Sequence, residues 1–176
     1  IGAYSVIIII SGYGMVAFRD PNGIRPLIYG KKDQFKYMFS SESVALDCLG
    51  YSIKGDVKPG ETIYIDQEGD FYNHIYNGEI NHSPCIFEYV YLARPDSTID
   101  NINVYNSRLK MGVMLAKKIK KELTKKELND IDVVIPIPDT SRTSALPLSI
   151  ELDKKLREGF VKNRYIGRTF IMPGQK

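Results

Sequence analysis

Residues 131–142 read Ile-Asp-Val-Val-Ile-Pro-Ile-Pro-Asp-Thr-Ser-Arg, an apolar run that ends in a polar turn. A run such as Ile131–Ile137 is typical of a strand buried in a parallel sheet. A second helix is expected after the turn, with Pro147 at its start, at a kink or at a break. Upstream, apolar residues alternate with lysines at the spacing of an amphipathic helix, namely Met111, Leu115, Ile119 and Leu123. A helix, a buried strand and a polar turn in this order indicate an α/β domain.

The polar turn is the strongest candidate for chemistry. It follows the carboxyl end of the predicted strand, where open α/β sheets bind their ligands. Thr140 and Ser141 offer hydroxyls, N–H groups at the start of a following helix favour an anion, and Arg142 can hold phosphate through two parallel hydrogen bonds. Asp139 has the wrong sign for phosphate alone and suits a metal ion or a ribose hydroxyl. A helix cap without any ligand explains the same residues equally well.

The first half of the chain has a different pattern. Residues 1–80 contain short β-branched and aromatic runs separated by turns rich in glycine, proline and asparagine. The expected strands are 4–10, which we expect to be buried, and 15–18, 24–29, 37–40, 62–65 and 71–75, with a short helix over 44–49 capped within 41–43. Many short strands with few helices suit an antiparallel sheet layer in an α+β fold. Residues 76–84 are polar and turn-rich, so we expect two domains, 1–84 and 85–176.

Composition and charge favour a cytoplasmic protein. The formal net charge of +3 is too small to indicate nucleic-acid binding, and we interpret the lysines of residues 110–126 as the solvated face of a helix. Two cysteines in 176 residues suggest a reducing compartment rather than a disulfide scaffold. No apolar run approaches the roughly 20 residues of a membrane span. We expect neither nucleic acid nor membrane as a partner, and both chain ends are expected to be cuts within a longer protein.

Residues 162–169 read Lys-Asn-Arg-Tyr-Ile-Gly-Arg-Thr and concentrate cations around Gly167. A segment of this kind can form a mobile basic flap over a phosphorylated substrate. A solvated loop is the alternative, and from these residues alone it is the more common outcome.

Several segments closely resemble the family of glutamine phosphoribosylpyrophosphate amidotransferases. They are GMVAFRDPNGIRPL at 14–27, SESVALD at 41–47, FEYVYLARPDS at 87–97 and GFVKNRYIGRTFI at 159–171. They occur in the family's order, and the resemblance covers nearly the whole chain.

This resemblance implies an α+β part followed by an α/β part. Residues 1–84 are expected to be the second half of an N-terminal-nucleophile αββα glutaminase domain, and residues 85–176 the start of a type I phosphoribosyltransferase domain. The family uses an N-terminal cysteine thiol to release ammonia from glutamine. Cys48 and Cys85 are internal, so we expect no catalytic nucleophile in this chain. The implied activity of the parent converts phosphoribosylpyrophosphate, glutamine and water to 5-phosphoribosylamine, glutamate and pyrophosphate, the first committed step of purine synthesis.

The resemblance also assigns roles to individual residues and names partners. Ser141 stands at a position associated with Mg²⁺, the expected cofactor. The expected partners are glutamine, phosphoribosylpyrophosphate and further copies of the chain in a homo-oligomer. Arg142 and Pro147 stand where the family usually has small or apolar helix formers. The substrate-binding residues implied are Asp139, Thr140, Ser141, Lys162, Arg164 and Arg168. The ammonia-channel residues implied are Phe87, Tyr91, Tyr165, Phe170 and Ile171.

Two alternatives remain open from the sequence. One is a non-catalytic scaffold or regulatory homologue that lacks the nucleophile. The other is a different N-terminal-nucleophile amidotransferase, such as a glucosamine-phosphate synthase. The turn at 136–142 and the basic segment argue against the second alternative, because that family carries a different second domain.

Overall fold

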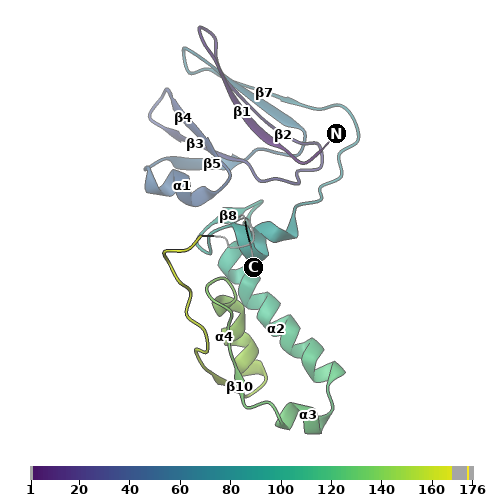
Figure 1. The fold of residues 1–176 in the computed structure, drawn as a ribbon. Coiled ribbons are helices and arrows are strands. Elements are labelled where there is room, and N and C mark those ends of the chain that lie inside the picture. The colour runs from purple at the N-terminus through teal and green to yellow at the C-terminus, as the bar shows by residue number, and fades with distance from the viewer. Residues whose placement is uncertain (1, 168–173, 175–176) are drawn as a thin grey trace. The chain divides into compact units, whose positions relative to one another are not determined.

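The computed structural model describes residues 2–167 and 174, and the chain divides into two compact units, 1–107 and 108–176. Figure 1 shows the course of the chain from the strands of the first unit to the helices of the second. The first unit is built mainly from antiparallel strands, and the second from helices with one short parallel strand pair.

One sheet of the first unit is four-stranded and antiparallel, in the order β1-β2-β6-β7. Its strands are β1 (Ser5–Ile10), β2 (Gly14–Arg19), β6 (Glu61–Asp66) and β7 (Phe71–Ile75). The expected strands at 15–18, 62–65 and 71–75 are therefore confirmed. The expectation of a buried first strand is wrong, because β1 lies at the sheet edge and Ile9 is 80% exposed.

The second sheet of this unit is three-stranded, in the order β4-β3-β5. Its strands are β3 (Ile28–Lys32), β4 (Lys36–Ser40) and β5 (Ser52–Asp56), and helix α1 (Ser43–Cys48) packs against them. The strand expected at 24–29 begins only at Ile28, because the carboxylate of Asp20 holds the preceding residues in a turn by accepting N–H bonds from Asn22, Ile24 and Arg25.

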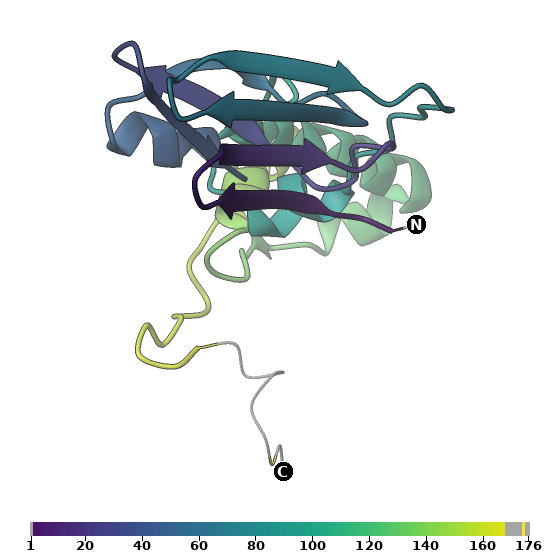
Figure 2. The same ribbon diagram turned by 90° about the horizontal axis from the view of Figure 1, so that it is seen from above.

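The two sheets form two layers of the first unit, as Figure 2 shows, and one apolar core lies between them. Buried side chains from both sheets and from the connections between them make up this core, namely Ala17, Leu27, Phe39, Val57, Ile63 and Ile65. At the margin of the core, the ring of Tyr29 on β3 stacks on that of Phe71 on β7 with centroids 5.6 Å apart. The alternating burial of β6 follows from this arrangement, since one face points into the core and the other away.

Residues 85–107 belong to the same compact unit as the two sheets. They form the single π-helical turn η1 (Glu88–Leu92) and a hairpin of β8 (Thr98–Ile99) and β9 (Ile102–Asn103). The hairpin turn consists of Asp100 and Asn101, with φ of +48° and +62°. Aspartate and asparagine tolerate this left-handed conformation better than most residues, which fits the residue types at the turn.

In the second unit, helix α2 (Val104–Glu122, which begins in the first unit) is followed by α3 (Lys125–Asn129) and α4 (Arg142–Glu151). Strands β10 (Val133–Val134) and β11 (Lys155–Leu156) pair in parallel. The helix predicted around Met111–Leu123 is confirmed, but its buried line runs through Gly112 and Ala116 instead of Leu115. Glycine is needed there, since a Cβ at Gly112 would lie 2.1 Å from the carbonyl oxygen of Ser144 on α4.

The strand expected at 131–137 is parallel, as predicted, but it is only two residues long. The expectation that it is buried is wrong, because Val133, Ile135 and Ile137 are 37%, 41% and 62% exposed. In the part of the chain that the structure describes, β11 is its single strand partner, and α4 is the helix that contacts it. Strand pairing leaves the faces of a strand open, so its burial depends on the elements that pack against those faces.

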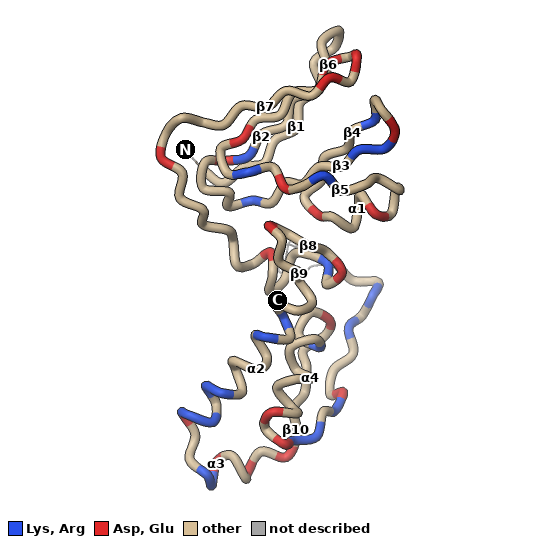
Figure 3. Tube along the Cα trace, turned by 180° about the vertical axis from the view of Figure 1, so that it is seen from behind, with Lys and Arg blue, Asp and Glu red and all other residues tan. Residues whose placement is uncertain are grey.

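The lysines of α2 are exposed, and Figure 3 shows from behind how positively charged residues are distributed along this helix. Their exposure agrees with the interpretation as a solvated helix face. Among the described residues, no helix combines the length and apolar character needed to cross a bilayer.

Candidate functional site

The polar turn before α4 forms the first candidate site, and its side chains are open to solvent. Ser141 is the N-cap residue of α4, yet its hydroxyl makes no capping bond and donates instead to the carbonyl oxygen of Ile137. The side chain of Ser141 therefore does not cap the helix. Two cations approach the Asp139 carboxylate, the Arg142 Nε and the Lys162 Nζ, each at 3.9 Å.

Arg142 has a second partner in the same unit. Its Nη2 donates to Oε2 of Glu158 at 3.0 Å, and both side chains are about half exposed, at 48% and 59%. Arg142 thus bridges the turn and the segment that follows β11. An exposed ion pair of this kind is weak and exchanges readily for another anion.

The basic segment meets the turn through Lys162. Arg164 is exposed, and Tyr165 is 99% exposed, with its backbone N–H donating to the Asn163 side chain. Three of the residues assigned a role by resemblance, Arg168, Phe170 and Ile171, lie outside the residues that the structure describes.

The two remaining channel candidates lie in the first unit. Phe87 precedes η1 and is 62% exposed, and Tyr91 lies within η1 and is 40% exposed. Their assignment to a channel remains a prediction.

The side chains at the turn suit a metal ion carried by a substrate rather than one held by the protein alone. Within the described parts of the chain, no group of three or more His, Cys, Asp or Glu side chains is placed to hold a metal ion. Mg²⁺ commonly binds through one or two carboxylates together with substrate phosphates, and Asp139 with the Ser141 hydroxyl fits that pattern.

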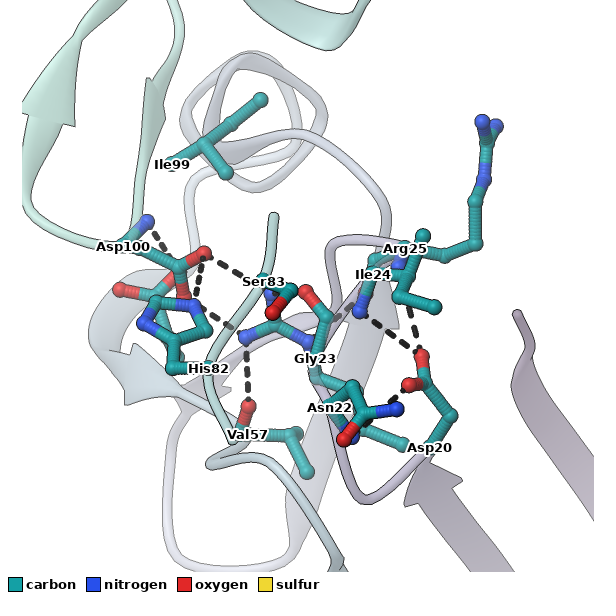
Figure 4. Close-up of polar contacts among 12 residues, drawn as sticks. Asp20, Asn22, Gly23, Ile24, Arg25, Val57, His82, Ser83, Ile99 and Asp100 are labelled. Carbon is teal, nitrogen blue, oxygen red and sulfur yellow. Dashed lines mark hydrogen bonds and ion pairs between the residues drawn. The ribbon is translucent and has the colours of Figure 1, made fainter. Parts of the chain in front are cut away.

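A second, buried polar cluster lies in the first unit and was not foreseen from the sequence. Its centre is Arg19, which is 2% exposed at the end of β2. All five N–H donors of its guanidinium have acceptors. Two of them bind the Asp100 carboxylate at 2.6 and 2.8 Å. The others bind the carbonyl oxygens of Gly23, Arg25 and Val57, and Figure 4 shows these groups converging.

Asp100 is the acceptor that completes this cluster. Its own backbone N–H donates to Asp56 at 3.1 Å, and its carboxylate lies 3.3 Å from Nε2 of His82. Burial disfavours its charge, but the hydrogen bonds and charge of Arg19, aided by His82, hold the pKa of Asp100 below its usual value. Burial raises the pKa of Asp56, so the two carboxyl groups are shifted in opposite directions.

Further polar contacts attach residues 85–103 to the second sheet and its helix. The Glu42 carboxylate accepts bonds from the Arg94 N–H and the Ser97 hydroxyl, both at 2.8 Å. The Ser43 hydroxyl accepts from the Thr98 N–H at 2.9 Å. The residues 41–43, expected to cap α1, therefore serve the neighbouring segment, and α1 has no side-chain cap.

Two residues of η1 also make polar contacts with other segments of the first unit. Glu88 lies 2.9 Å from Nη1 of Arg25, and burial raises the pKa of its carboxyl. The Tyr89 hydroxyl donates to the carbonyl oxygen of Ile99 at 3.3 Å, and burial raises the pKa of Tyr89 to about 12. The segment at 14–27 contains Arg19, but nothing in the sequence connects Arg19 with Asp100, which lies eighty-one positions away. The cluster could therefore not be predicted from the sequence.

Curated proteins resemble this chain over nearly its whole length. No protein-family model matches the chain. The chain is 56% identical over 178 residues to an amidophosphoribosyltransferase of Pseudomonas aeruginosa and 56% identical over 179 residues to one of Escherichia coli. Each match covers 99% of this chain and 35% of the relative. The relative from Saccharomyces cerevisiae is 47% identical over 185 residues.

Solved structures give the same result. The glutamine phosphoribosylpyrophosphate amidotransferase of Bacillus subtilis, complexed with ADP and GMP, matches with a TM-score of 0.81 and 38% identity, over 99% of this chain and 36% of that one. A structure described as the allosteric regulatory enzyme of purine biosynthesis matches with a TM-score of 0.80.

Fold and sequence thus define the class as that of the phosphoribosylpyrophosphate amidotransferases. Within it, the chain belongs to the amidophosphoribosyltransferase family. The chain spans 35% of the length of the curated relatives it matches.

Proposed function

We propose that the protein carrying this chain converts phosphoribosylpyrophosphate, glutamine and water to 5-phosphoribosylamine, glutamate and pyrophosphate. The observation that carries the proposal is 56% identity across 99% of the chain to proteins named for this reaction. The approach of Lys162 to the Asp139 turn supports it, because a substrate diphosphate needs cations from both segments at one place.

The domain assignment is part of this proposal. Residues 1–84 belong to an N-terminal-nucleophile αββα glutaminase domain, and residues 85–176 open a type I phosphoribosyltransferase domain. Two stacked antiparallel sheets with α1 on the second support the first assignment. The parallel strand pair β10–β11, in a unit that otherwise consists mainly of helices, supports the second assignment. In the structure, residues 85–107 pack with the first compact unit, so the boundary between the units lies after the proposed domain boundary at residue 84.

At the turn, the chain's own residues bind and orient the diphosphate. Lys162 and Arg142 supply positive charge, and the hydroxyls of Thr140 and Ser141 supply donors. Arg164 and Arg168 add charge from the basic segment. An incoming diphosphate competes with Asp139 for these exposed cations. The ion pairs of Arg142 and Lys162 with Asp139 are already weakened by water. Mg²⁺, when bound with the substrate, neutralises the leaving pyrophosphate.

The transfer of ammonia requires an apolar passage. Ammonia must remain neutral and away from water to act as the nucleophile, so aromatic and aliphatic walls suit it. We assign this role to Phe87, Tyr91, Tyr165, Phe170 and Ile171. The exposure of Phe87, Tyr91 and Tyr165 in their separate units supports the assignment, since a passage wall must present its side chains at a surface.

The remaining parts of the proposal concern the protein's setting. We propose a cytoplasmic homo-oligomer that binds neither nucleic acid nor membrane. The exposed lysines of α2, spread along a helix face, agree with a solvated surface.

The test uses the whole protein that contains this chain. With glutamine, phosphoribosylpyrophosphate and Mg²⁺, we expect glutamate and pyrophosphate to appear in equal amounts. Omission of phosphoribosylpyrophosphate serves as the control and is expected to lower glutamate release. A purified protein that consumes no glutamine in the complete mixture would overturn the proposal and favour a non-catalytic scaffold.

A further inference from the structure

Glu42, Glu88 and Asp100 are three of the carboxylates that bind residues 85–103 to the two sheets of the first unit. Glu88 pairs with the partly exposed guanidinium of Arg25, and Glu42 accepts bonds from uncharged groups, the Arg94 N–H and the hydroxyl of the buried Ser97. Asp100 differs, because its partner Arg19 is almost completely buried. The attachment at Asp100 is therefore the most rigid of the three.

The Arg19 guanidinium allows little movement of the hairpin. Its remaining donors hold carbonyl oxygens in the turn at 23–25 and at Val57, so it cannot follow Asp100 outward without losing them. Any shift of the hairpin leaves a buried charge without its partner, and such a charge carries a large desolvation penalty. The position of the 98–103 hairpin is thus fixed relative to β2.

The hairpin in turn fixes η1. The Tyr89 hydroxyl binds the Ile99 carbonyl oxygen, the residue just before Asp100. Phe87 and Tyr91 lie immediately before and within η1, and their side chains are exposed. A displacement at Asp100 is therefore passed to these two aromatic side chains through a short chain of packed and hydrogen-bonded groups.

We propose that Arg19 and Asp100 are a positioning pair that sets the place of Phe87 and Tyr91 and thereby couples glutamine hydrolysis to amine transfer. This inference rests on the proposed function, in which those aromatic residues line the ammonia passage. Neither member of the pair touches substrate. A pair with only a structural role changes stability and scales both reactions together, whereas a positioning pair changes their ratio.

The experiment compares Asp100→Asn with the whole unaltered protein. Glutamate and phosphoribosylamine are measured in the same reaction, and transfer is measured again with added ammonium in place of glutamine. We expect the ratio of glutamate to phosphoribosylamine to rise by roughly twofold to thirtyfold, the range of coupling changes seen for connecting residues. Transfer from ammonium should stay within about twofold, because the transferase site is untouched.

Asp96→Asn is the matched control. It makes the same chemical change four residues earlier, in an ion pair with Arg94 whose side chains are 53% and 64% exposed. We expect its ratio to equal that of the unaltered protein, and a rise equal to that of Asp100→Asn would overturn the inference.

The outcomes separate this inference from the function on which it rests. If the unaltered protein makes no phosphoribosylamine from glutamine, the proposed function fails. If it does, and Asp100→Asn keeps the normal ratio, the positioning role fails while the function stands. Should Asp100→Asn not fold, Tyr89→Phe removes the next hydrogen bond in the chain with little change in packing. A smaller rise in its ratio supports the inference, and an unchanged ratio overturns it.

Discussion

The two units carry two clusters of charged residues that differ in almost every physical respect. In the first unit, Arg19 meets Asp100 at 2.6 Å with side chains 1% and 12% exposed. In the second unit, Arg142 meets Glu158 at 3.0 Å with both side chains about half exposed, and it lies 3.9 Å from Asp139. The buried cluster uses every donor internally, whereas the exposed one leaves its cations in water.

This difference teaches what each cluster is suited to do. A buried pair with all hydrogen bonds satisfied holds one arrangement, because any other arrangement leaves a buried charge without its partner. An exposed, loosely spaced cluster contributes little to stability and exchanges partners easily, which suits the binding of a charged ligand. The first cluster therefore specifies architecture, and the second is available for chemistry.

The strongest way to break this comparison is Arg19→Ala. Removal of one partner of a buried pair leaves the Asp100 charge uncompensated, so we expect the unfolding free energy of the first unit to fall by about 3–5 kcal/mol. Urea unfolding followed by amide exchange in β2 and β8–β9 measures the loss in the whole protein. Arg142→Ala is the matched control, with an expected change below about 1 kcal/mol. Equal losses in the two variants would contradict the distinction.

A sharper test of the exposed cluster is Lys162→Ala. If this lysine binds the diphosphate, its loss should raise the KM for phosphoribosylpyrophosphate about tenfold or more, equivalent to one charge-assisted hydrogen bond. Lys126→Ala changes an exposed lysine in α3 and should leave the KM unchanged. Steady-state kinetics of pyrophosphate release measure both variants. A normal KM in Lys162→Ala would remove this residue from the site.

The pH dependence of stability distinguishes the carboxyl groups within the buried cluster. The pKa of Asp100 is lowered in the folded protein, so its stabilising contribution is present above its unfolded pKa of about 3.9 and is lost as pH falls through the lower folded value. The stability advantage of the unaltered protein over Asp100→Asn should therefore shrink in acid.

Asp56→Asn provides the opposite case. Burial raises the pKa of Asp56, so its ionised form disfavours folding above the folded pKa, and this penalty disappears as pH falls toward the unfolded value. Relative to Asp56→Asn, the unaltered protein should gain stability on acidification. Thermal unfolding between pH 3 and 7, a range of about four units around the reference value, measures both trends. Parallel curves for the two variants would be inconsistent with the opposite shifts.

The smallest expected effect belongs to Glu158→Gln. This change removes the charged partner of Arg142 in an exposed pair, so stability should change by less than about 1 kcal/mol. Because Arg142 then lacks the charged partner Glu158, pyrophosphate should bind at least as tightly as it does to the unaltered protein. Calorimetry measures this binding. Weaker pyrophosphate binding would show that the pair orders the site instead of competing with the ligand.

Much of the local structure followed from the sequence. The β-branched runs and turn residues placed most strands of the first unit, and the apolar spacing placed α2, because these patterns depend on neighbours within a few residues. Errors appeared where packing decides. The run at 131–137 has the composition of a buried strand, but burial depends on which elements pack against its faces, and Val133, Ile135 and Ile137 are 37%, 41% and 62% exposed. Likewise, α2 buries Gly112 and Ala116, since close approach of α4 requires small side chains there.

By itself, the sequence determined the family, the main elements and the residues at the polar turn, since each is written in a contiguous stretch. Only the tertiary structure brought Arg19 to Asp100, and Lys162 to Asp139. The physical reason is that an ion pair between distant residues leaves no local pattern. Its partners are chosen by the path of the backbone, and the energy of the pair depends on how completely the fold removes it from water.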